Sequence, residues 1–282
     1  MTSNKIIEYY NHALIDYKRI WRLDRNLAIH YGYYDSENKT HDKAVVNMNR
    51  VLSEIAKITP KDRVLDAGCG IGGSSIWIAK NIGARVTGLN IHKGQLEIAR
   101  QLAIKNRVEN LTEFTEGDFT KTNLQDNSFD VVLGLESVCY AKNKKDFIRE
   151  ARRILKNNGR LVVADGFLQK ENLDVKEKEE MKKWLNGWAV PNLSTLNDFK
   201  KYLKQLKFTN VKFLDIKKNV MPSSTRMYKA SIICYPIGKI LEFLGIRNKT
   251  QTANIVSAFY QHKTLKKGLW TYGIFYAEKS LS

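Results

Sequence analysis

The sequence is poor in cysteine, and its histidines are scattered. Three cysteines occur among 282 residues, namely Cys69, Cys139 and Cys234. Because they are odd in number and far apart, we expect no disulfide framework and a reducing compartment. The five histidines show no metal-ligand spacing with the cysteines, so we expect no metal site.

Long hydrophobic runs are also missing. No apolar stretch reaches the roughly 18 residues that a membrane span needs. Glu8, His12 and Asp16 interrupt the N-terminal stretch, which therefore does not resemble a signal peptide. Hydrophobic residues make up 43% of the chain and charged residues 27%, as in soluble globular proteins. We expect a cytoplasmic protein, and peripheral contact with a membrane is the alternative localisation.

Acidic residues are scarce in the last third of a chain whose net charge is +18. From Lys200 to Ser282 there are 16 lysines and arginines against three acids. So basic a surface favours an anionic partner: a phospholipid surface, a phosphorylated substrate or nucleic acid. A lysine-rich composition with a solvated surface explains the charge equally well.

The first 60 residues predict a helical cap. Helical spacing runs from 5 to 28, with one apolar face made of Tyr10, Leu14, Tyr17 and Trp21. An aromatic loop, HYGYYD, follows at 30–35, and a second helical pattern at 42–58 ends before Pro60.

Residues 61–170 alternate between strand and helix patterns. Buried strands are expected at 63–67, 84–90, 111–118, 129–135 and 160–167, with helices between them. The helix at 145–159 is expected to end at Gly159. Continuous apolar strands alternating with helices indicate an α/β fold with a doubly wound parallel sheet.

Residues 171–282 are expected to complete the sheet within one structural domain. Helices are predicted at 172–186 and 196–206, a strand at 208–216, mostly helix at 224–264, and an antiparallel final strand at 268–279. We expect 224–264 and the N-terminal helix to form a lid over the carboxyl ends of the strands, where such sheets bind ligands.

The loop D-A-G-C-G-I-G-G at 66–73 is typical of nucleotide-binding turns. It satisfies G-x-G-x-x-G, the dinucleotide fingerprint. However, Asp66 would repel a pyrophosphate, whereas it can contact loop amides and an ammonium group. The second strand ends in Asn90 rather than an acid. The third ends in Gly-Asp-Phe (117–119), where Asp118 suits an adenine amino group and Phe119 its flank.

Five motifs together carry a resemblance to a known family. VLDAGCGIGGSS, VTGLN, GDF, NSFDVV and LESVCYA, in this order and spacing, resemble a class I S-adenosylmethionine-dependent methyltransferase over about residues 30–170. GCGIGGSS is similar to tocopherol methyltransferases, and GLN, DF and E-x-x-C are similar to sterol side-chain methyltransferases. W-x-x-x-W-x-x-P at 184–191 and D-I-x-x-x-V-x-P at 215–222 follow the tocopherol layout more loosely. The resemblance implies a seven-stranded Rossmann-like methyltransferase sheet with helical lid insertions.

The resemblance also implies S-adenosyl-L-methionine as cofactor, with S-adenosyl-L-homocysteine as product. The residues expected to bind it are Tyr33, Asp66, Gly68, Cys69, Gly70, Asn90, Ile91, Gln95, Asp118, Phe119 and Leu135. Of these, Asp66 and the loop would contact the methionine part, Asn90 and Ile91 the ribose and adenine, and Leu135 the amino-acid end. Packing alone also explains the glycines and Cys69.

Methyl transfer from a sulfonium requires alignment of acceptor, methyl and sulfur, and exclusion of water. A base is needed only where a proton must leave. Glu136, Tyr140 and His30 are the candidate catalytic residues. Sterol enzymes have His at the Tyr140 position, which weakens a general-base role there, and Tyr140 is equally well explained as a packed aromatic. Glu136 has a second explanation, contact with the cofactor ammonium or the N-terminal cap, and a lone His30 is more often structural.

Tyr31, Trp184, Trp188 and Pro191 are the candidate walls of an acceptor pocket. Such walls predict a large apolar acceptor: a prenylated quinol, terpenoid, polyketide or alkaloid-like molecule, methylated on carbon, oxygen or nitrogen. An anionic acceptor, such as a prenyl diphosphate or phosphobase, is the alternative. A nucleic-acid substrate is not expected, because no N-P-P-Y-type tetrad follows the fourth strand. A non-catalytic S-adenosylmethionine-binding protein is the alternative of another class.

Overall fold

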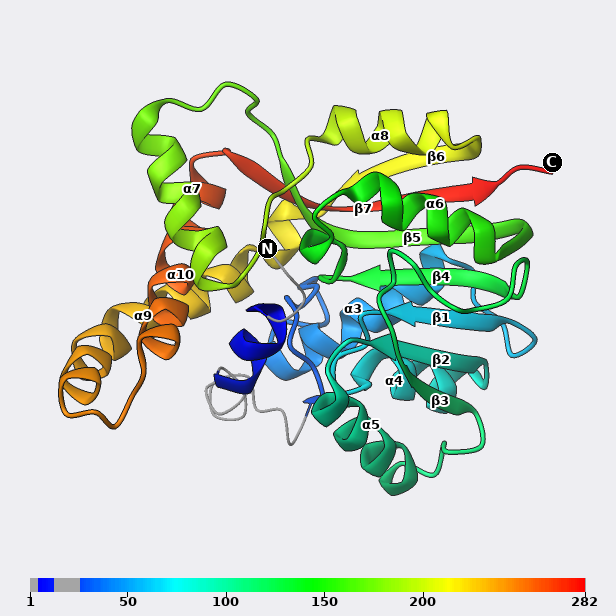
Figure 1. The fold of residues 1–282 in the computed structure, drawn as a ribbon, viewed down its shortest axis with the longest axis horizontal. Coiled ribbons are helices and arrows are strands. Elements are labelled where there is room, and N and C mark those ends of the chain that lie inside the picture. Colours follow the sequence, from blue (N-terminus) through cyan, green and yellow to red (C-terminus); the bar gives the residue numbers. More distant parts are fainter. Residues whose placement is uncertain (1–4, 13–25, 282) are drawn as a thin grey trace.

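The computed structural model describes residues 5–12 and 26–281 and contains one seven-stranded sheet (Figure 1). The strand order is β3-β2-β1-β4-β5-β7-β6, and β7 runs antiparallel to both of its neighbours. The strands are β1 Arg63–Ala67, β2 Arg85–Asn90, β3 Thr112–Glu116, β4 Phe129–Leu135, β5 Leu155–Leu168, β6 Phe208–Asp215 and β7 Trp270–Lys279. The predicted α/β class and the antiparallel final strand are confirmed.

Helices cover both faces of the sheet. They are α3 His41–Ile55, α4 Gly73–Ile82, α5 Lys93–Lys105, α6 Lys144–Ile154, α7 Val175–Gly187, α8 Leu196–Gln205, α9 Lys217–Phe243 and α10 Lys249–Lys266, with a 3-10 turn at Val138–Tyr140. Alternate strand residues point to opposite faces. Val64 therefore packs in the core under α3, α4 and α5, whereas Leu65 packs in the core under α6 and α8.

Helix α6 ends earlier than predicted. It stops at Ile154, and β5 begins at Leu155, so Gly159 lies within the strand and does not end the helix. Leu155 is fully buried and pairs with Phe129 of β4. The register of this pairing shifts before Arg160, so β5 bends between two paired stretches. Burial of Leu155 in the core overrides the helical pattern of the local sequence.

Three helical elements lie beyond the carboxyl ends of β1 and β4, on the left of Figure 1. They are α7, α9 and α10, and the helical segment 5–12 lies with them. The stretch 224–264, predicted to be mostly helical, lies in α9 and α10, an antiparallel pair that forms a projecting hairpin. Of the apolar face predicted for 5–28, Tyr10 lies in segment 5–12, whereas Leu14, Tyr17 and Trp21 lie outside the described residues.

Helix α10 holds α7 in place by close backbone packing and by charge. A Cβ atom on Gly187 of α7 would lie 2.1 Å from Ser257 Oγ and 2.5 Å from Ala253 O of α10. The buried Glu180 of α7 pairs with Lys263 at 2.9 Å and with Lys267 at 2.5 Å. The position of α7, and therefore of Trp184 and of Trp188 at its C-terminal end, depends on these contacts.

We predict that Gly187→Ala lowers the free energy of unfolding by about 1–3 kcal/mol, because the added methyl group overpacks the contact between α7 and α10. Urea denaturation of wild type and variant measures this. Gly94→Ala on the exposed start of α5 is the matched control, with no backbone of another element close by. Equal loss of stability in both variants would contradict a specific effect at Gly187.

Candidate active site

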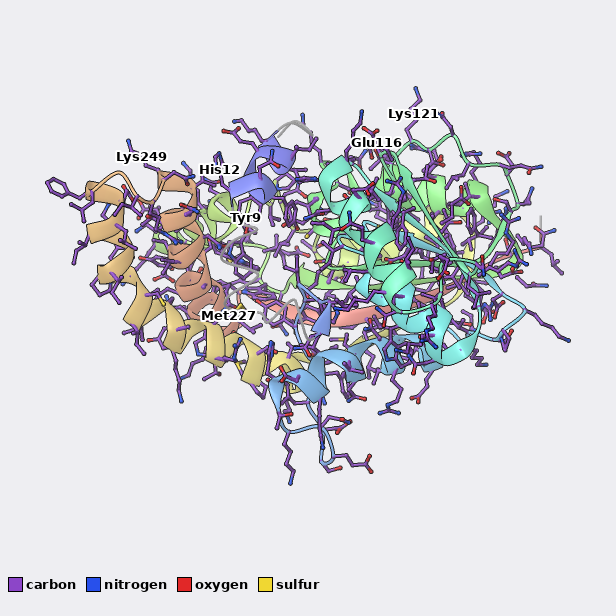
Figure 2. All side chains as sticks on the ribbon, turned by 90° about the horizontal axis from the view of Figure 1, so that it is seen from below. Tyr9, His12, Glu116, Lys121, Met227 and Lys249 are labelled. Carbon is purple, nitrogen blue, oxygen red and sulfur yellow. The ribbon has the colours of Figure 1, made fainter. Side chains whose placement is uncertain are left out.

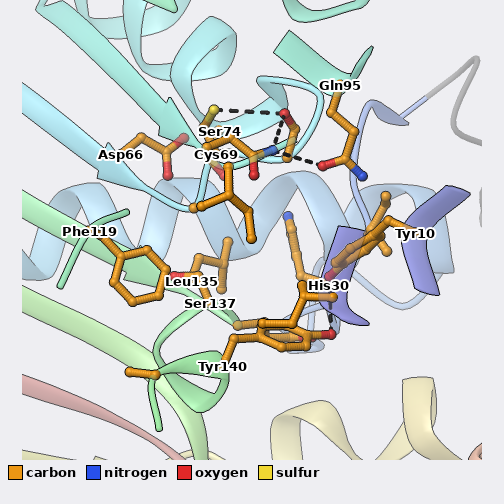
Figure 3. A pocket seen from close by; sticks show the side chains of 18 of the residues that line it. Tyr10, His30, Asp66, Cys69, Ser74, Gln95, Phe119, Leu135, Ser137 and Tyr140 are labelled. Carbon is orange, nitrogen blue, oxygen red and sulfur yellow. Dashed lines mark hydrogen bonds between the residues drawn. The ribbon is translucent and has the colours of Figure 1, made fainter. Parts of the chain in front are cut away.

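A cavity of about 300 Å³ lies at the carboxyl ends of β1, β2 and β4 (Figure 3). The loops after these strands form one side, and residues of segment 5–12 and of 27–30 form the other. Most of the predicted site residues line it: His30, Asp66, Gly68, Cys69, Gly70, Asn90, Ile91, Gln95, Asp118, Phe119, Leu135, Glu136 and Tyr140. The fold thus brings together residues that are more than 100 positions apart in the sequence.

The glycine loop is fixed against β2. The backbone N–H groups of Gly68 and Cys69 both donate to Leu89 O, at 2.8 and 3.0 Å. Gly68 has a φ of +87°, and a Cβ there would lie 2.4 Å from Ser137 Cβ, so only glycine fits. Burial raises the pKa of the Cys69 thiol well above its usual range. The thiol therefore stays protonated at neutral pH and is a packing group rather than a nucleophile.

Asp66 is anchored to the first turn of α4. Its Oδ2 accepts a hydrogen bond of 2.7 Å from the hydroxyl of Ser75, which is fully buried. Burial raises the pKa of Asp66 to about 6, and the bond from Ser75 opposes this shift. The backbone N–H of Ser75 also donates to Asp66, so the carboxylate contacts both an amide and a hydroxyl at the start of α4, and it lines the cavity.

Two side-chain amides meet at the end of β2. Asn90 Nδ2 donates to Gln95 Oε1 at 2.8 Å and to Gly70 O at 3.2 Å. Gln95 is buried, and its Nε2 has no hydrogen-bond partner among the described residues. An unsatisfied buried donor beside a cavity is suited to a ligand hydroxyl or carboxylate.

The end of β3 contributes a more open wall. Asp118 is exposed, and its Oδ1 accepts from the backbone N–H and the hydroxyl of Thr120, at 2.8 and 2.6 Å. The Phe119 ring packs edge-on against Phe147, with 5.5 Å between ring centroids. The carboxylate is thus held in one orientation at the rim, next to an apolar ring.

Two predicted residues lie elsewhere. Tyr33 lines neither this cavity nor the second one described below. Its backbone is bonded to α3, with its N–H donating to Ala44 O at 2.8 Å and its carbonyl accepting from Asn47 Nδ2 at 2.9 Å. Pro191 also lines neither cavity, whereas Val190 and Leu193 beside it do. The path of each loop, which residue type does not set, thus leaves Tyr33 and Pro191 outside the lining of both cavities.

A second cavity of about 70 Å³ adjoins the first, and the two share Tyr10, Ile29, Glu136 and Tyr140. The predicted Tyr31, Trp184 and Trp188 line it. Its further walls were not predicted from sequence: Asp165, Trp270 and Tyr272. Trp184 stacks on Trp270 with 4.2 Å between ring centroids. The indole Nε1 atoms of Trp184 and Trp188 are buried without a hydrogen-bond partner among the described residues.

Glu136 lies between the two cavities and binds other elements. Its Oε1 accepts a hydrogen bond of 2.7 Å from the backbone N–H of Tyr31 and one of 2.8 Å from the hydroxyl of Tyr272. Burial raises its pKa to about 8, and both bonds oppose the shift. Its φ of +49° is in the left-handed region, an unusual conformation that often occurs at functional sites. The contact with the N-terminal cap, one of the two explanations considered from sequence, is therefore present.

His30 and Tyr140 complete this boundary (Figure 3). His30 Nδ1 lies 2.9 Å from Tyr31 O, which as a carbonyl only accepts, so Nδ1 carries the proton. Nε2 is buried with no partner among the described residues. Burial lowers the pKa of His30 to about 4, so the ring is neutral at pH 7. The hydroxyl of Tyr140 lies 3.1 Å from that of Tyr10.

Asp165 was missed from sequence, although it follows the buried run LVVA of β5 and so stands where parallel strands place ligands. It accepts from the backbone N–H of Cys139 at 2.8 Å, and burial raises its pKa to about 6. Nearby, the buried Lys144 donates to Cys139 O at 2.9 Å and to Asn192 Oδ1 at 2.6 Å. These two residues hold the turn that carries Tyr140.

Comparison with known proteins identifies the domain. Residues 65–163 match the family model described as "Methyltransferase domain". The chain carries a class I S-adenosylmethionine-dependent methyltransferase domain. S-adenosylmethionine is the cofactor of this domain, and Gln95 Nε2 and the Asp118 carboxylate are suited to hold it. Within residues 5–12 and 26–281, no helix has both the length and the apolar character that crossing a bilayer requires.

The chain is similar to enzymes of the two groups indicated by its motifs. It is 35% identical to sterol 24-C-methyltransferase ERG6B of Gibberella zeae over 54% of this chain and 39% of that protein. It is 23% identical to tocopherol O-methyltransferase of Arabidopsis thaliana over 98% of this chain and 82% of that protein. The match thus covers about two fifths of the length of the sterol enzyme. The cyclopropane synthase MmaA2 of Mycobacterium tuberculosis has the same fold, with a TM-score of 0.83 at 14% identity over 99% of each chain.

We predict that Asp118→Ala weakens binding of S-adenosylhomocysteine by about 1–3 kcal/mol, because the rim loses a carboxylate acceptor. Isothermal titration calorimetry measures the affinity. Glu116→Ala is the control: it removes the same charge from the same strand end, but Glu116 does not line the cavity. Unchanged affinity in Asp118→Ala would remove Asp118 from the cofactor site.

A second prediction concerns the pH dependence of stability. Since the pKa of Glu136 is raised from 4.5 to about 8 in the folded state, the folded protein keeps a proton that the unfolded chain releases. This contribution to stability is full below about pH 4.5 and is lost as pH rises through 8. Glu136→Gln should therefore lose less stability than wild type between pH 5 and pH 8.5 in urea unfolding. The exposed Glu97→Gln should follow wild type, and parallel curves for all three proteins would contradict the shift.

Proposed function

We propose that the whole protein transfers a methyl group from S-adenosylmethionine to an apolar small molecule. The observation that carries this proposal is the pair of adjoining cavities that share Glu136 and Tyr140. In this proposal the larger cavity holds the cofactor, and the smaller one receives the reacting end of the acceptor. The cofactor supplies an electrophilic methyl group, and the residues between the cavities position the acceptor for in-line attack.

The cofactor would be held by polar groups around the larger cavity. Gln95 Nε2 and the Asn90 amide meet at one place and would bond the ribose hydroxyls. Asp118 would accept from the adenine amino group, with the Phe119 ring beside it. Gly68 leaves room for close backbone approach to the methionine part. The unsatisfied Gln95 donor supports this assignment, since it gains a partner when the site is filled.

Glu136 would accept the proton that the acceptor loses. With a pKa of about 8, its carboxyl group is mostly protonated at pH 7, and a nearby positive charge such as a sulfonium favours its ionised form. A carboxyl group poised near neutral pH suits proton acceptance from the acceptor. His30, with a pKa near 4, is a weaker base, and its unpartnered Nε2 would accept a hydrogen bond instead. Tyr140 would contribute an aromatic wall that favours a cation.

The acceptor would be apolar rather than phosphorylated. Aromatic side chains from α7 and β7 dominate the smaller cavity, and no lysine or arginine is among the described residues that line it. A diphosphate or phosphobase would lack a cationic partner there. The similarity to sterol and tocopherol methyltransferases also supports a lipid-like acceptor. The basic C-terminal third would then contact an anionic membrane, in which such an acceptor would dissolve.

A label transfer assay tests the proposal. We expect the protein, incubated with trideuteromethyl S-adenosylmethionine and a whole-cell extract, to place a label of three extra mass units in a product in the organic phase. Trp188→Ala should raise KM for that acceptor about tenfold or more while leaving cofactor affinity unchanged, because Trp188 lines only the smaller cavity.

Label confined to an anionic aqueous product would instead support a phosphorylated acceptor. Methylation of added RNA, weakened by salt, would support a nucleic-acid substrate. Calorimetric binding of S-adenosylhomocysteine without label in any extract fraction would support a non-catalytic binding protein.

A further inference from the structure

The outer end of the α9–α10 hairpin is an exposed apolar surface. We define the hairpin tip as residues 232–246. Thirteen large hydrophobic side chains are exposed among the described residues, and eight of them lie in the tip. Phe243 is 90% exposed, Ile246 71% and Ile233 68%. The other exposed apolar side chains are spread over the rest of the molecule, so this concentration is a property of the tip.

Packing of the hairpin does not account for this surface. Helix α9 contacts α10 through its opposite face, where Gly238 is buried and a Cβ atom would lie 2.9 Å from Ile255 Cδ1. On the outer face, apolar residues recur at helical spacing and are all exposed: Ile233, Ile237, Ile240 and Leu244. One face of α9 is therefore covered by α10, whereas its outer face at the tip is apolar and exposed.

Positive charge surrounds the hairpin tip. Lys229, Lys239, Arg247 and Lys249 lie within or beside it, and Figure 2 shows Lys249 at the outer end of the hairpin, with Met227 nearer its base. The one acid of the tip, Glu242, pairs with Lys239 at 3.1 Å. An apolar stripe bordered by lysines is the pattern of interfacial helices that lie in the headgroup region of anionic bilayers.

We propose that the hairpin tip inserts into the interface of an anionic lipid bilayer and holds the enzyme at the membrane. The apolar side chains enter the acyl boundary, and the flanking lysines contact lipid phosphates. This inference rests on the proposed function in one respect, since an apolar acceptor would be taken from that bilayer.

The tip is also connected to the cap of the larger cavity. Asn248, two residues after the tip, bonds His12 Nδ1 at 2.9 Å, and Asn254 of α10 accepts from the hydroxyl of Tyr9 at 3.0 Å. Figure 2 labels Tyr9 and His12 on segment 5–12. Segment 5–12 supplies Ile6 and Tyr10 to the cavity wall. A lipid-bound tip would thus be hydrogen-bonded to the segment that forms part of the wall of the larger cavity, where an acceptor would enter.

Vesicle flotation with the full chain tests the proposal. We expect binding to vesicles of phosphatidylcholine with about 30% phosphatidylglycerol, and little binding to pure phosphatidylcholine or in high salt, which screens surface charge. Phe243→Ser with Ile246→Ser should reduce the bound fraction about fivefold or more. Ile104→Ser is the matched control, because Ile104 is 61% exposed on α5, far from the tip in sequence. Lys229→Glu with Lys249→Glu should weaken binding to anionic vesicles, whereas Lys105→Glu should not.

A spectroscopic variant gives a second measurement. Phe243→Trp should show a blue-shifted indole emission with anionic vesicles, because the side chain leaves water. The double variant Phe243→Ser with Ile246→Ser and the control Ile104→Ser should both keep wild-type activity on acceptor dissolved in detergent. This result would separate membrane binding from the proposed function. If wild type binds vesicles but never transfers a methyl group, the proposed function fails and this one stands.

Three results would overturn the proposal. The first is equal vesicle binding by wild type and Phe243→Ser with Ile246→Ser. The second is a concentration-dependent dimer that the same substitutions abolish, seen by light scattering without vesicle binding, which would assign the tip to a second copy of this chain. The third is equal binding to neutral and anionic vesicles.

Discussion

The buried carboxyl group of Glu136 joins three parts of the chain that are distant in sequence. It follows β4, accepts from Tyr31 of the N-terminal cap, and accepts from Tyr272 of β7. A buried acceptor must be satisfied or it costs free energy, so these bonds fix the cap over the sheet. The same burial raises the pKa of the carboxyl group to about 8. One interaction therefore sets both the wall between the two cavities and the charge state of the group within it.

Positive charge and the aromatic cavity lie in separate parts of this protein. The interior of the smaller cavity is aromatic and has no lysine or arginine among its described lining residues. Of the 16 lysines and arginines from Lys200 to Ser282, nine lie between Lys217 and Lys266, in the hairpin of α9 and α10. Buried Glu180, which binds Lys263 and Lys267, ties α7 to this hairpin. The helix that carries Trp184 and Trp188 is thereby held by the element that we propose to contact lipid.

Prediction from sequence succeeded where a local segment by itself determines the feature. Asn90 ends a strand, the glycine loop, Asp118 and Phe119 follow strands, and parallel strands bring their carboxyl ends to one edge. It failed where the outcome depends on a distant partner. Gly159 does not end a helix, because burial of Leu155 extends β5. The backbone of Tyr33 is bonded to Ala44 and Asn47 of α3, and no pattern within 30–35 reveals these contacts.

The sequence by itself determined the fold class, the methyltransferase domain and the positions of most cavity residues. These follow from hydrophobic periodicity and from glycines whose backbone geometry no other residue adopts. Only the tertiary structure decided that Asp165, Trp270 and Tyr272 complete a second cavity, and that one face of α9 stays exposed. Those features depend on how β5, β7 and α10 pack against segments far away in the chain. Burial, and with it the raised pKa of Glu136 and the lowered pKa of His30, exists only once that packing has formed.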